Sequence, residues 1–152
     1  MTVTESVVVV EPIELAFETP ADPELAWSFL TDPDRVREWF TEVAPLGGVG
    51  DAYRLDFGED SVVEGEILEL EPGRRFAHGW AWSDAERVAE RPTRVEWRVE
   101  PIPGGGSRII LRHDGWTEAG SDDAIRDDHE AYWSGYLDDL RDLLEEAARL
   151  RP

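Results

Sequence analysis

The longest regular pattern in this sequence runs from about Ser121 to Arg149, where apolar residues recur every three or four positions. That spacing predicts one amphipathic helix with a single apolar stripe. At about 1.5 Å per residue, such a helix is more than about 35 Å long and can cross a whole small sheet. The stripe consists of Ile125, Tyr132, Tyr136, Leu140, Leu143 and Ala147, and it is widened by Trp133, Leu137 and Leu144. We therefore expect a sheet with one apolar face beneath this helix.

Alternation of apolar and polar residues with a period of two fills most of the chain before this helix. It is cleanest at Val95, Trp97 and Val99, which would share one face of a strand. Turn sequences rich in glycine and proline separate the alternating segments, which favours an antiparallel meander. The expected strands are Ile13–Glu18 (with Val7–Val10 as a candidate extension), Tyr53–Phe57, Val62–Leu70, Arg75–Ser83, Thr93–Glu100 and Arg108–His113, with a polar loop at Ala85–Pro92.

Two short helices are predicted between the first strand and the meander. The segment Thr19–Glu24 combines a capping residue, an early proline and acidic residues, which is typical of a helix start. Asp32 and Pro33 then restart the helical pattern, and a second short helix follows through Phe40. One strand, two short helices, a meander and a long terminal helix make an α+β layout, in which the terminal helix covers the apolar face of the sheet.

The composition fits one domain over residues 1–152. Hydrophobic residues make up 41% of the chain and include seven Trp, so they can build a substantial core. The formal charge of -20 repels phosphate backbones and anionic lipids, so we expect neither nucleic-acid nor membrane binding. The absence of cysteine excludes disulfides, thiolate zinc sites and cysteine nucleophiles. No secretory signal and no membrane-spanning run are evident, so we expect a cytoplasmic protein.

Every basic residue is Arg, and Lys, Asn and Gln are all missing. A GC-rich genome explains this bias, and so does adaptation to salt or heat, since acidic surfaces stay soluble in brine and amide side chains are thermolabile. Both explanations stay open.

Several local motifs, in this order, resemble the START-like or SRPBCC helix-grip superfamily. They are Ala26–Pro33, Glu38–Phe40, Gly65–Pro72, Gly105–Trp116 and His129–Leu140. Within the superfamily, the sequence is most similar to the branch of activator-of-heat-shock-protein-ATPase homologues, near the polyketide cyclases. The resemblance implies a helix-grip fold, a curved antiparallel sheet with a long C-terminal helix over its concave face, and a cavity between the two. The positions that it implies as cavity lining are Trp80, Trp97, His113, Tyr132, Trp133 and Tyr136.

The residues themselves allow two interpretations of each candidate. Trp80 shares one strand face with Phe76, His78 and Trp82, and these rings either fill the core or line a ligand pocket. His113, beside Asp114, is either a polar anchor or general base at a pocket mouth, or a structural histidine. His129 lies on the apolar stripe of the terminal helix, either across a cavity from His113 or capping the stripe at its wet end.

Motifs for other chemistry fail on spacing. His129 and Glu130 begin like a zinc-protease helix, but Trp133 stands where the second histidine is needed. The glycines at 47–50 lack the lysine and helix of a phosphate-binding loop, and no nucleophile elbow is present. We therefore expect no metal, no cofactor and no catalytic residue.

The leading hypothesis is a non-catalytic protein that binds a small, largely apolar molecule between the sheet and the terminal helix. A polyketide cyclase-like enzyme, with His113 or His129 as acid–base group, is the first alternative. A chaperone-regulating interaction module, implied by the resemblance alone, is the second. A homodimer paired through strand edges near Val7–Val10 is a further prediction.

Overall fold

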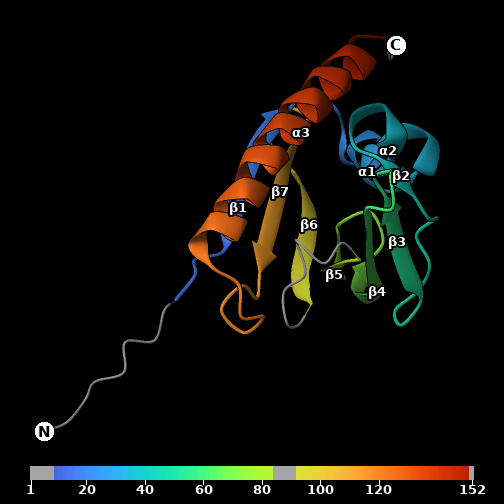
Figure 1. The fold of residues 1–152 in the computed structure, drawn as a ribbon. Helices are drawn as coiled ribbons and strands as arrows, with labels where there is room; N and C mark the ends of the chain where they lie inside the picture. Colours follow the sequence, from blue (N-terminus) through green and yellow to red (C-terminus); the bar gives the residue numbers. More distant parts are fainter. Residues whose placement is uncertain (1–8, 84–91, 151–152) are drawn as a thin grey trace, which may run out of the picture.

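The computed structural model describes residues 9–83 and 92–150. Figure 1 shows a curled antiparallel sheet with helix α3 running across it and the two shorter helices beside its upper end. The elements in chain order are β1 (Ile13–Thr19), α1 (Pro23–Thr31), α2 (Pro33–Trp39), β2 (Glu42–Val43), β3 (Ala52–Asp56), β4 (Val62–Glu71), β5 (Arg75–Trp82), β6 (Thr93–Pro101), β7 (Ser107–Asp114) and α3 (Asp123–Leu150).

The sheet has seven strands in the order β1-β7-β6-β5-β4-β3-β2, so β2 to β7 form a meander and β1 joins at the β7 edge. This arrangement confirms the α+β helix-grip prediction, with both short helices and the long terminal helix where they were expected. The two-residue strand β2 was not predicted. The candidate strand at Val7–Val10 and the loop at Ala85–Pro92 lie largely outside the described residues; Val9 and Val10 are not in a strand.

Two aspartates set the paths of the short helices. Asp22 accepts a hydrogen bond at 2.8 Å from the Leu25 backbone N–H, and Pro23 occupies the first turn of α1. Asp32 ends α1 and also caps α2, where its side chain accepts from the Asp34 N–H at 3.0 Å. Because one residue serves both helices, the chain turns sharply between them and brings the end of α2 back over the sheet.

The sheet curls because two strands approach closely at a glycine. A Cβ built on Gly65 of β4 would lie 2.2 Å from the carbonyl oxygen of Gly79 in β5, so only glycine fits there. The pairing of β4 with β5 then shifts register between Ile67 and Glu69. Such a shift bends the bulged strand and increases its twist. The curl leaves a concave surface under α3.

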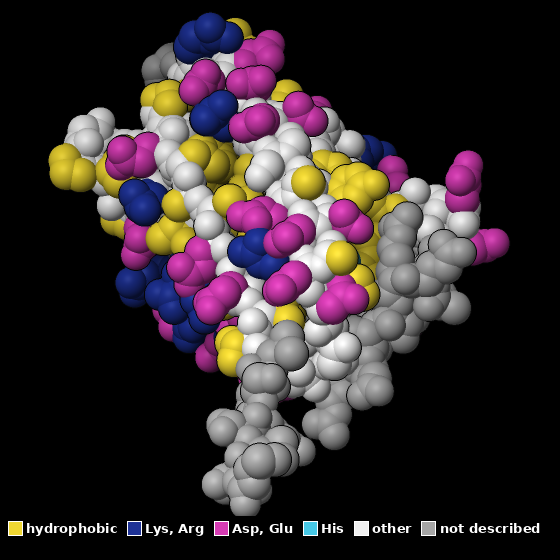
Figure 2. Space-filling view, turned by 60° about the vertical axis from the view of Figure 1, so that its left-hand side comes forward, with side chains coloured by type: hydrophobic (Ala, Val, Ile, Leu, Met, Phe, Trp, Pro, Cys, Tyr) yellow, Lys and Arg dark blue, Asp and Glu magenta, His cyan; other side chains and the backbone are white. Residues whose placement is uncertain are grey.

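The outer face of the sheet is charged, as the alternation in β6 predicts. Glu96 is buried there and pairs with Arg98 at 2.6 Å, and also with Arg75 and Arg94. Burial by itself would raise the pKa of the Glu96 carboxyl, but the hydrogen bond from Arg98 and the charges of Arg98 and Arg94 lower it overall. Figure 2, in which the left-hand side of Figure 1 comes forward, shows acidic side chains scattered over that face, with arginines and hydrophobic side chains among them.

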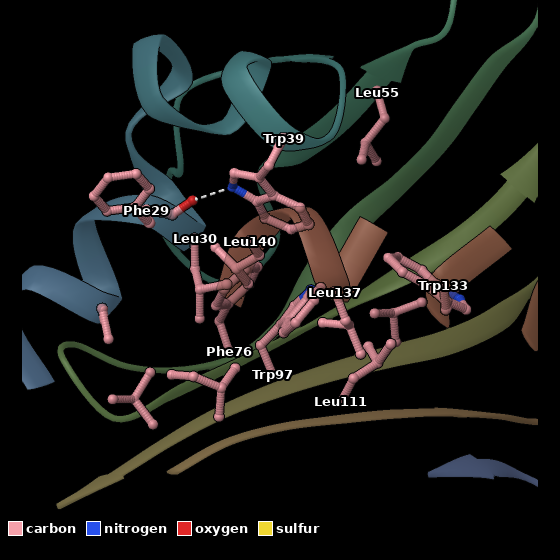
Figure 3. Close-up of a cluster of buried hydrophobic side chains, with 14 of the residues drawn as sticks. Phe29, Leu30, Trp39, Leu55, Phe76, Trp97, Leu111, Trp133, Leu137 and Leu140 are labelled. Carbon is pink, nitrogen blue, oxygen red and sulfur yellow. Dashed lines mark hydrogen bonds between the residues drawn. The ribbon is translucent and has the colours of Figure 1, made fainter. Parts of the chain in front are cut away.

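The core lies between the concave face and α3 (Figure 3). Leu137, Leu140 and Leu144 of α3 are buried in one cluster with Trp97 and Leu111 of the sheet. Trp39 at the end of α2 enters the same cluster, where its indole N–H donates to the Phe29 carbonyl at 2.8 Å. Among the described helices, none is long and apolar enough to cross a membrane.

Candidate ligand pocket

A pocket of about 530 Å³ opens between the N-terminal half of α3, the end of β5 and the turn that joins β3 to β4. It reaches the surface, since Tyr132 on its rim is 67% exposed. Most of its lining is aromatic. The lining residues are Phe40, Phe57, Gly58, Glu59, Ser61, Trp80, Trp82, Ile125, Asp128, His129, Tyr132, Trp133 and Tyr136.

Five of the seven candidate residues line this pocket: Trp80, His129, Tyr132, Trp133 and Tyr136. The other two lie behind its wall. Trp97 is 3% exposed and packs edge-on against Trp39 and Trp133, with ring centroids 5.8 and 5.7 Å away. His113 is fully buried rather than at a pocket mouth. The alternation of β6 and β7 places both side chains on the inner face, but it does not say how deep along the strand the pocket extends.

Three aromatic lining residues were not among the candidates. Trp82 follows Trp80 on the same face of β5, and its ring lies 5.1 Å from that of Phe57. Phe57 continues the inward alternation of Tyr53 and Leu55, so the sequence did carry a signal for it. Phe40 follows α2 and contacts the ring of Tyr136 at 4.8 Å. The position of the Phe40 ring depends on how α2 folds back over the sheet, and no local sequence pattern predicts that.

The ring nitrogens of His113 are both engaged. The indole N–H of Trp133 donates to Nδ1 at 3.1 Å, and Nε2 lies 2.7 Å from the hydroxyl of Thr93. That hydroxyl donates to the Trp80 carbonyl, so Nε2 of His113 carries the proton and donates to Thr93. The result is a chain of hydrogen bonds from α3 through β7 and β6 to β5. His113 thus joins the pocket wall to the sheet.

His129 is held in the opposite tautomer. Its Nδ1 lies 2.8 Å from the Ile125 carbonyl, which can only accept, so Nδ1 carries the proton. Its Nε2 accepts a hydrogen bond from the indole of Trp82 at 2.9 Å. The histidine therefore ties Trp82 at the end of β5 to the first turns of α3, and both residues line the pocket.

Burial disfavours protonation of the two inner histidines. It lowers the pKa of His78 to about 4. It also lowers the pKa of His113 well below the ordinary value, and the charges that His129 and His78 would carry lower it further. Both rings are therefore neutral at pH 7, and for His113 the hydrogen bond that Nδ1 accepts from Trp133 requires this as well.

One polar atom in the pocket wall has no partner. The indole N–H of Trp80 is buried and makes no hydrogen bond to any described residue. A buried donor without an acceptor costs about 1–3 kcal/mol. Among the described residues, no group of three His, Asp or Glu side chains is arranged to hold a metal ion.

A curled antiparallel sheet that grips a long C-terminal helix, with an open pocket under one end of that helix, defines a helix-grip protein. The family model described as activator of Hsp90 ATPase homolog 1-like protein matches residues 20–145. The chain belongs to this family, and the sequence-based assignment to that branch is confirmed. A search of curated proteins returns no match.

Solved structures agree on the fold. Protein MLL2253 from Mesorhizobium loti is 18% identical with a TM-score of 0.78, over 90% of this chain and 98% of that one. The Aha1 dimer from Colwellia psychrerythraea is 20% identical with a TM-score of 0.72, over 90% and 97%. DynU16, a protein of the dynemicin biosynthetic locus, is 21% identical with a TM-score of 0.74 over 88% of this chain. This chain spans only 47%, about half, of DynU16.

Proposed function

We propose that this chain, acting as a single domain, binds a small, largely apolar organic molecule in the pocket under α3 and catalyses no reaction on it. The observation that carries the proposal is the pocket itself. Its volume of about 530 Å³ falls within the roughly 300–1,000 Å³ of small-molecule sites. Seven of its thirteen lining residues are aromatic, and the side chains of Glu59, Ser61, Asp128 and His129 add polar groups, a combination that suits an organic ligand.

The unpartnered indole of Trp80 supports the same proposal. An acceptor oxygen on a bound molecule would give this N–H the hydrogen bond that it lacks among the described residues. Trp80 lines the pocket, but its indole nitrogen is buried, so the ring or its neighbours must move before a ligand can accept from it.

The hydrogen bonds of the histidines argue against the cyclase alternative. A general base needs a free lone pair within reach of the substrate. The lone pair of His113 accepts from Trp133, and that of His129 accepts from Trp82. Either ring would have to break an indole hydrogen bond before it could accept a proton.

A homodimer and a chaperone partner stay predictions. The name of the matched family refers to an activator of Hsp90 ATPase, and one related structure is a dimer. Light scattering over a concentration series tests the first, and a pull-down with the chaperone tests the second. A monomer at all concentrations, or no retained chaperone, contradicts the respective prediction.

Tryptophan fluorescence tests ligand binding directly, because Trp80, Trp82 and Trp133 line the pocket. We expect a saturable change on titration with a panel of small aromatic and aliphatic compounds. Removal of one wall in Tyr132→Ala should weaken binding about 5–10-fold, as expected for one aromatic contact of about 1 kcal/mol. The control Leu68→Ala removes a half-exposed apolar side chain outside the pocket and should leave the affinity unchanged. The absence of any saturable change, or an equal loss in the control, contradicts the proposal.

A further inference from the structure

We propose that the ligand is an organic cation: a mainly apolar molecule that carries one amine or quaternary ammonium group. This inference rests on the proposed function, because it concerns the same pocket. Three features of the pocket point to it: the density of aromatic rings, the sign of the lining charges, and the geometry of the turn that carries one of them.

The aromatic rings supply the first feature. Seven of the thirteen lining residues are Phe, Tyr or Trp. The rings stand close together at varied angles, as in the pairs Phe40–Tyr136 and Phe57–Trp82, at 4.8 and 5.1 Å. The face of an aromatic ring is negative, and a cation within about 6 Å of the centroid is attracted to it. Several rings around one space make a site for an ammonium group that sheds its water.

The charged lining residues are the second feature. Glu59 of the β3–β4 turn and Asp128 of α3, both exposed, line the pocket, and the lining contains no arginine. Within the described part of the chain, neither carboxylate has an ion pair. The nearby Arg126 is already taken up by Asp127, Glu130 and two backbone carbonyls. The Nε2 atom of His129 accepts from the indole N–H of Trp82 and so offers no N–H to an anion. The charged groups of the described lining would therefore only repel an anionic ligand, whereas a cation meets two carboxylates without an ion pair.

The turn that carries Glu59 is the third feature. Glu59 and Asp60 have φ of 49° and 65° and are the only non-glycine residues with positive φ in the described chain. Such a conformation is unfavourable for a residue with a side chain and persists where the surroundings impose it. Here Phe57 N–H donates to the Ser61 carbonyl and Ser61 N–H donates to that of Gly58, both at 2.9 Å. The closed turn holds the Glu59 backbone at the pocket edge.

The formal charge of -20 also favours a cationic ligand, and it does so at longer range than the lining residues. Figure 2 shows acidic side chains spread over the exposed face of the protein. Such a field raises the local concentration of any cation, whether or not a specific site exists. The experiment must therefore separate the pocket from the general field.

Three probes with one carbon skeleton make the test: a phenylbutyl trimethylammonium ion, the corresponding neutral alcohol, and the corresponding sulfonate. Their affinities are measured by tryptophan fluorescence at low salt and at 0.5 M NaCl. We expect the cation to bind at least about tenfold more tightly than the alcohol, which corresponds to one desolvated cation–aromatic contact, and the sulfonate to bind most weakly. The preference should persist at high salt, where long-range attraction is screened.

Matched variants locate the effect. Glu59→Gln with Asp128→Asn should reduce the preference for the cation about fivefold or more while the affinity for the alcohol stays the same. The control pair is Glu66→Gln with Asp142→Asn, which makes the same charge change at exposed positions outside the pocket. Asp142 lies fourteen residues, about 21 Å, along α3 from Asp128. The control pair should keep the preference.

The outcomes separate the two proposals. Equal affinity for the cation and the alcohol, or tighter binding of the sulfonate, overturns the cation inference and leaves the ligand pocket standing. An equal loss in the control pair overturns it as well, since it assigns the preference to the general field. No binding of any of the three probes contradicts both the inference and the proposed function.

Discussion

The two halves of α3 cover the sheet in different ways. In the C-terminal half, Leu137, Leu140 and Leu144 are 6%, 0% and 0% exposed and close the core completely. In the N-terminal half, aromatic residues and His129 face a pocket, and Tyr132 is 67% exposed. One helix on one sheet thus makes a closed interface at one end and an open one at the other.

The difference follows from the shapes of the side chains and the curl of the sheet. Branched aliphatic side chains interdigitate to the density of an organic crystal. Aromatic rings are rigid plates that prefer tilted or edge-on contacts, with centroids 4.5–7 Å apart. Around Trp80, the rings of Trp82, His113 and Trp133 stand at 5.6, 5.3 and 5.3 Å, all tilted or edge-on. Rings that meet at such angles leave more space than leucines do, and the sheet curls past them toward β3.

The largest expected effect separates the two halves by stability. Leu140→Ala should lower the free energy of unfolding by about 2–5 kcal/mol, because it leaves a cavity in the closed half. Tyr132→Ala, on the rim of the open half, should lower it by less than about 0.5 kcal/mol. Urea unfolding followed by far-UV circular dichroism measures both. Similar losses in the two variants would mean that the open half is packed like the closed one in solution.

The next effect is the pH dependence of stability, which comes from the two fully buried histidines of the sheet, His78 and His113. The pKa of His78 is about 4 in the folded protein and about 6.5 in the unfolded chain. Between these values the unfolded chain binds more protons, so stability is complete above pH 6.5 and falls toward pH 4. This group alone contributes about 3 kcal/mol. The lowered pKa of His113 acts in the same direction.

Unfolding free energies at pH 7.5, 5.5 and 4.5 measure this loss. His78→Phe should flatten the profile, since Phe has no proton to bind. His129→Gln removes one of the two charges that lower the pKa of the buried His113, and it should change the profile less than His78→Phe does. If the profile of the parent is already flat from pH 7 to 4.5, the inner histidines are not buried in neutral form.

The closed half could be predicted from the sequence far better than the open half. The apolar stripe predicted a helix over Ser121–Arg149, and the observed helix is Asp123–Leu150. Alternation in β6 and β7 predicted which side chains face inward. Periodicity predicts these elements well because the residues on the packed face of a helix or strand recur at the repeat of that element. The two-residue strand β2 is too short to show a period.

The pocket forms where three segments of the chain come together, and the periodicity of any one segment does not predict how they do so. The alternation predicted that the side chains of Trp97 and His113 point inward, but it could not predict how far they lie from the pocket. Both lie behind the pocket wall. Phe40 lies on the pocket because Asp32 ends one helix and caps the next, which turns α2 over the sheet. Glu59 follows Gly58, and that glycine indicates a turn but does not indicate that Glu59 and Asp60 also take positive φ.

The smallest effect concerns the place where the two halves meet. Gly135 lies in α3 between Trp133, which lines the pocket, and Leu137, which closes the core. A Cβ added there would meet nothing within 4 Å. Glycine inside a helix is about 0.5–1 kcal/mol less favourable than alanine, so Gly135→Ala should stabilise the protein by that amount. Urea unfolding measures the gain, and a fluorescence titration on the same variant measures the affinity for the cationic probe.

We expect the affinity to stay the same, because the pocket is already open and α3 need not bend at Gly135 to admit a ligand. If Gly135→Ala stabilises the protein but weakens binding, then uptake requires the helix to bend between its halves. The closed half would then be the anchor against which the open half moves, and the two interfaces would be coupled through this one residue.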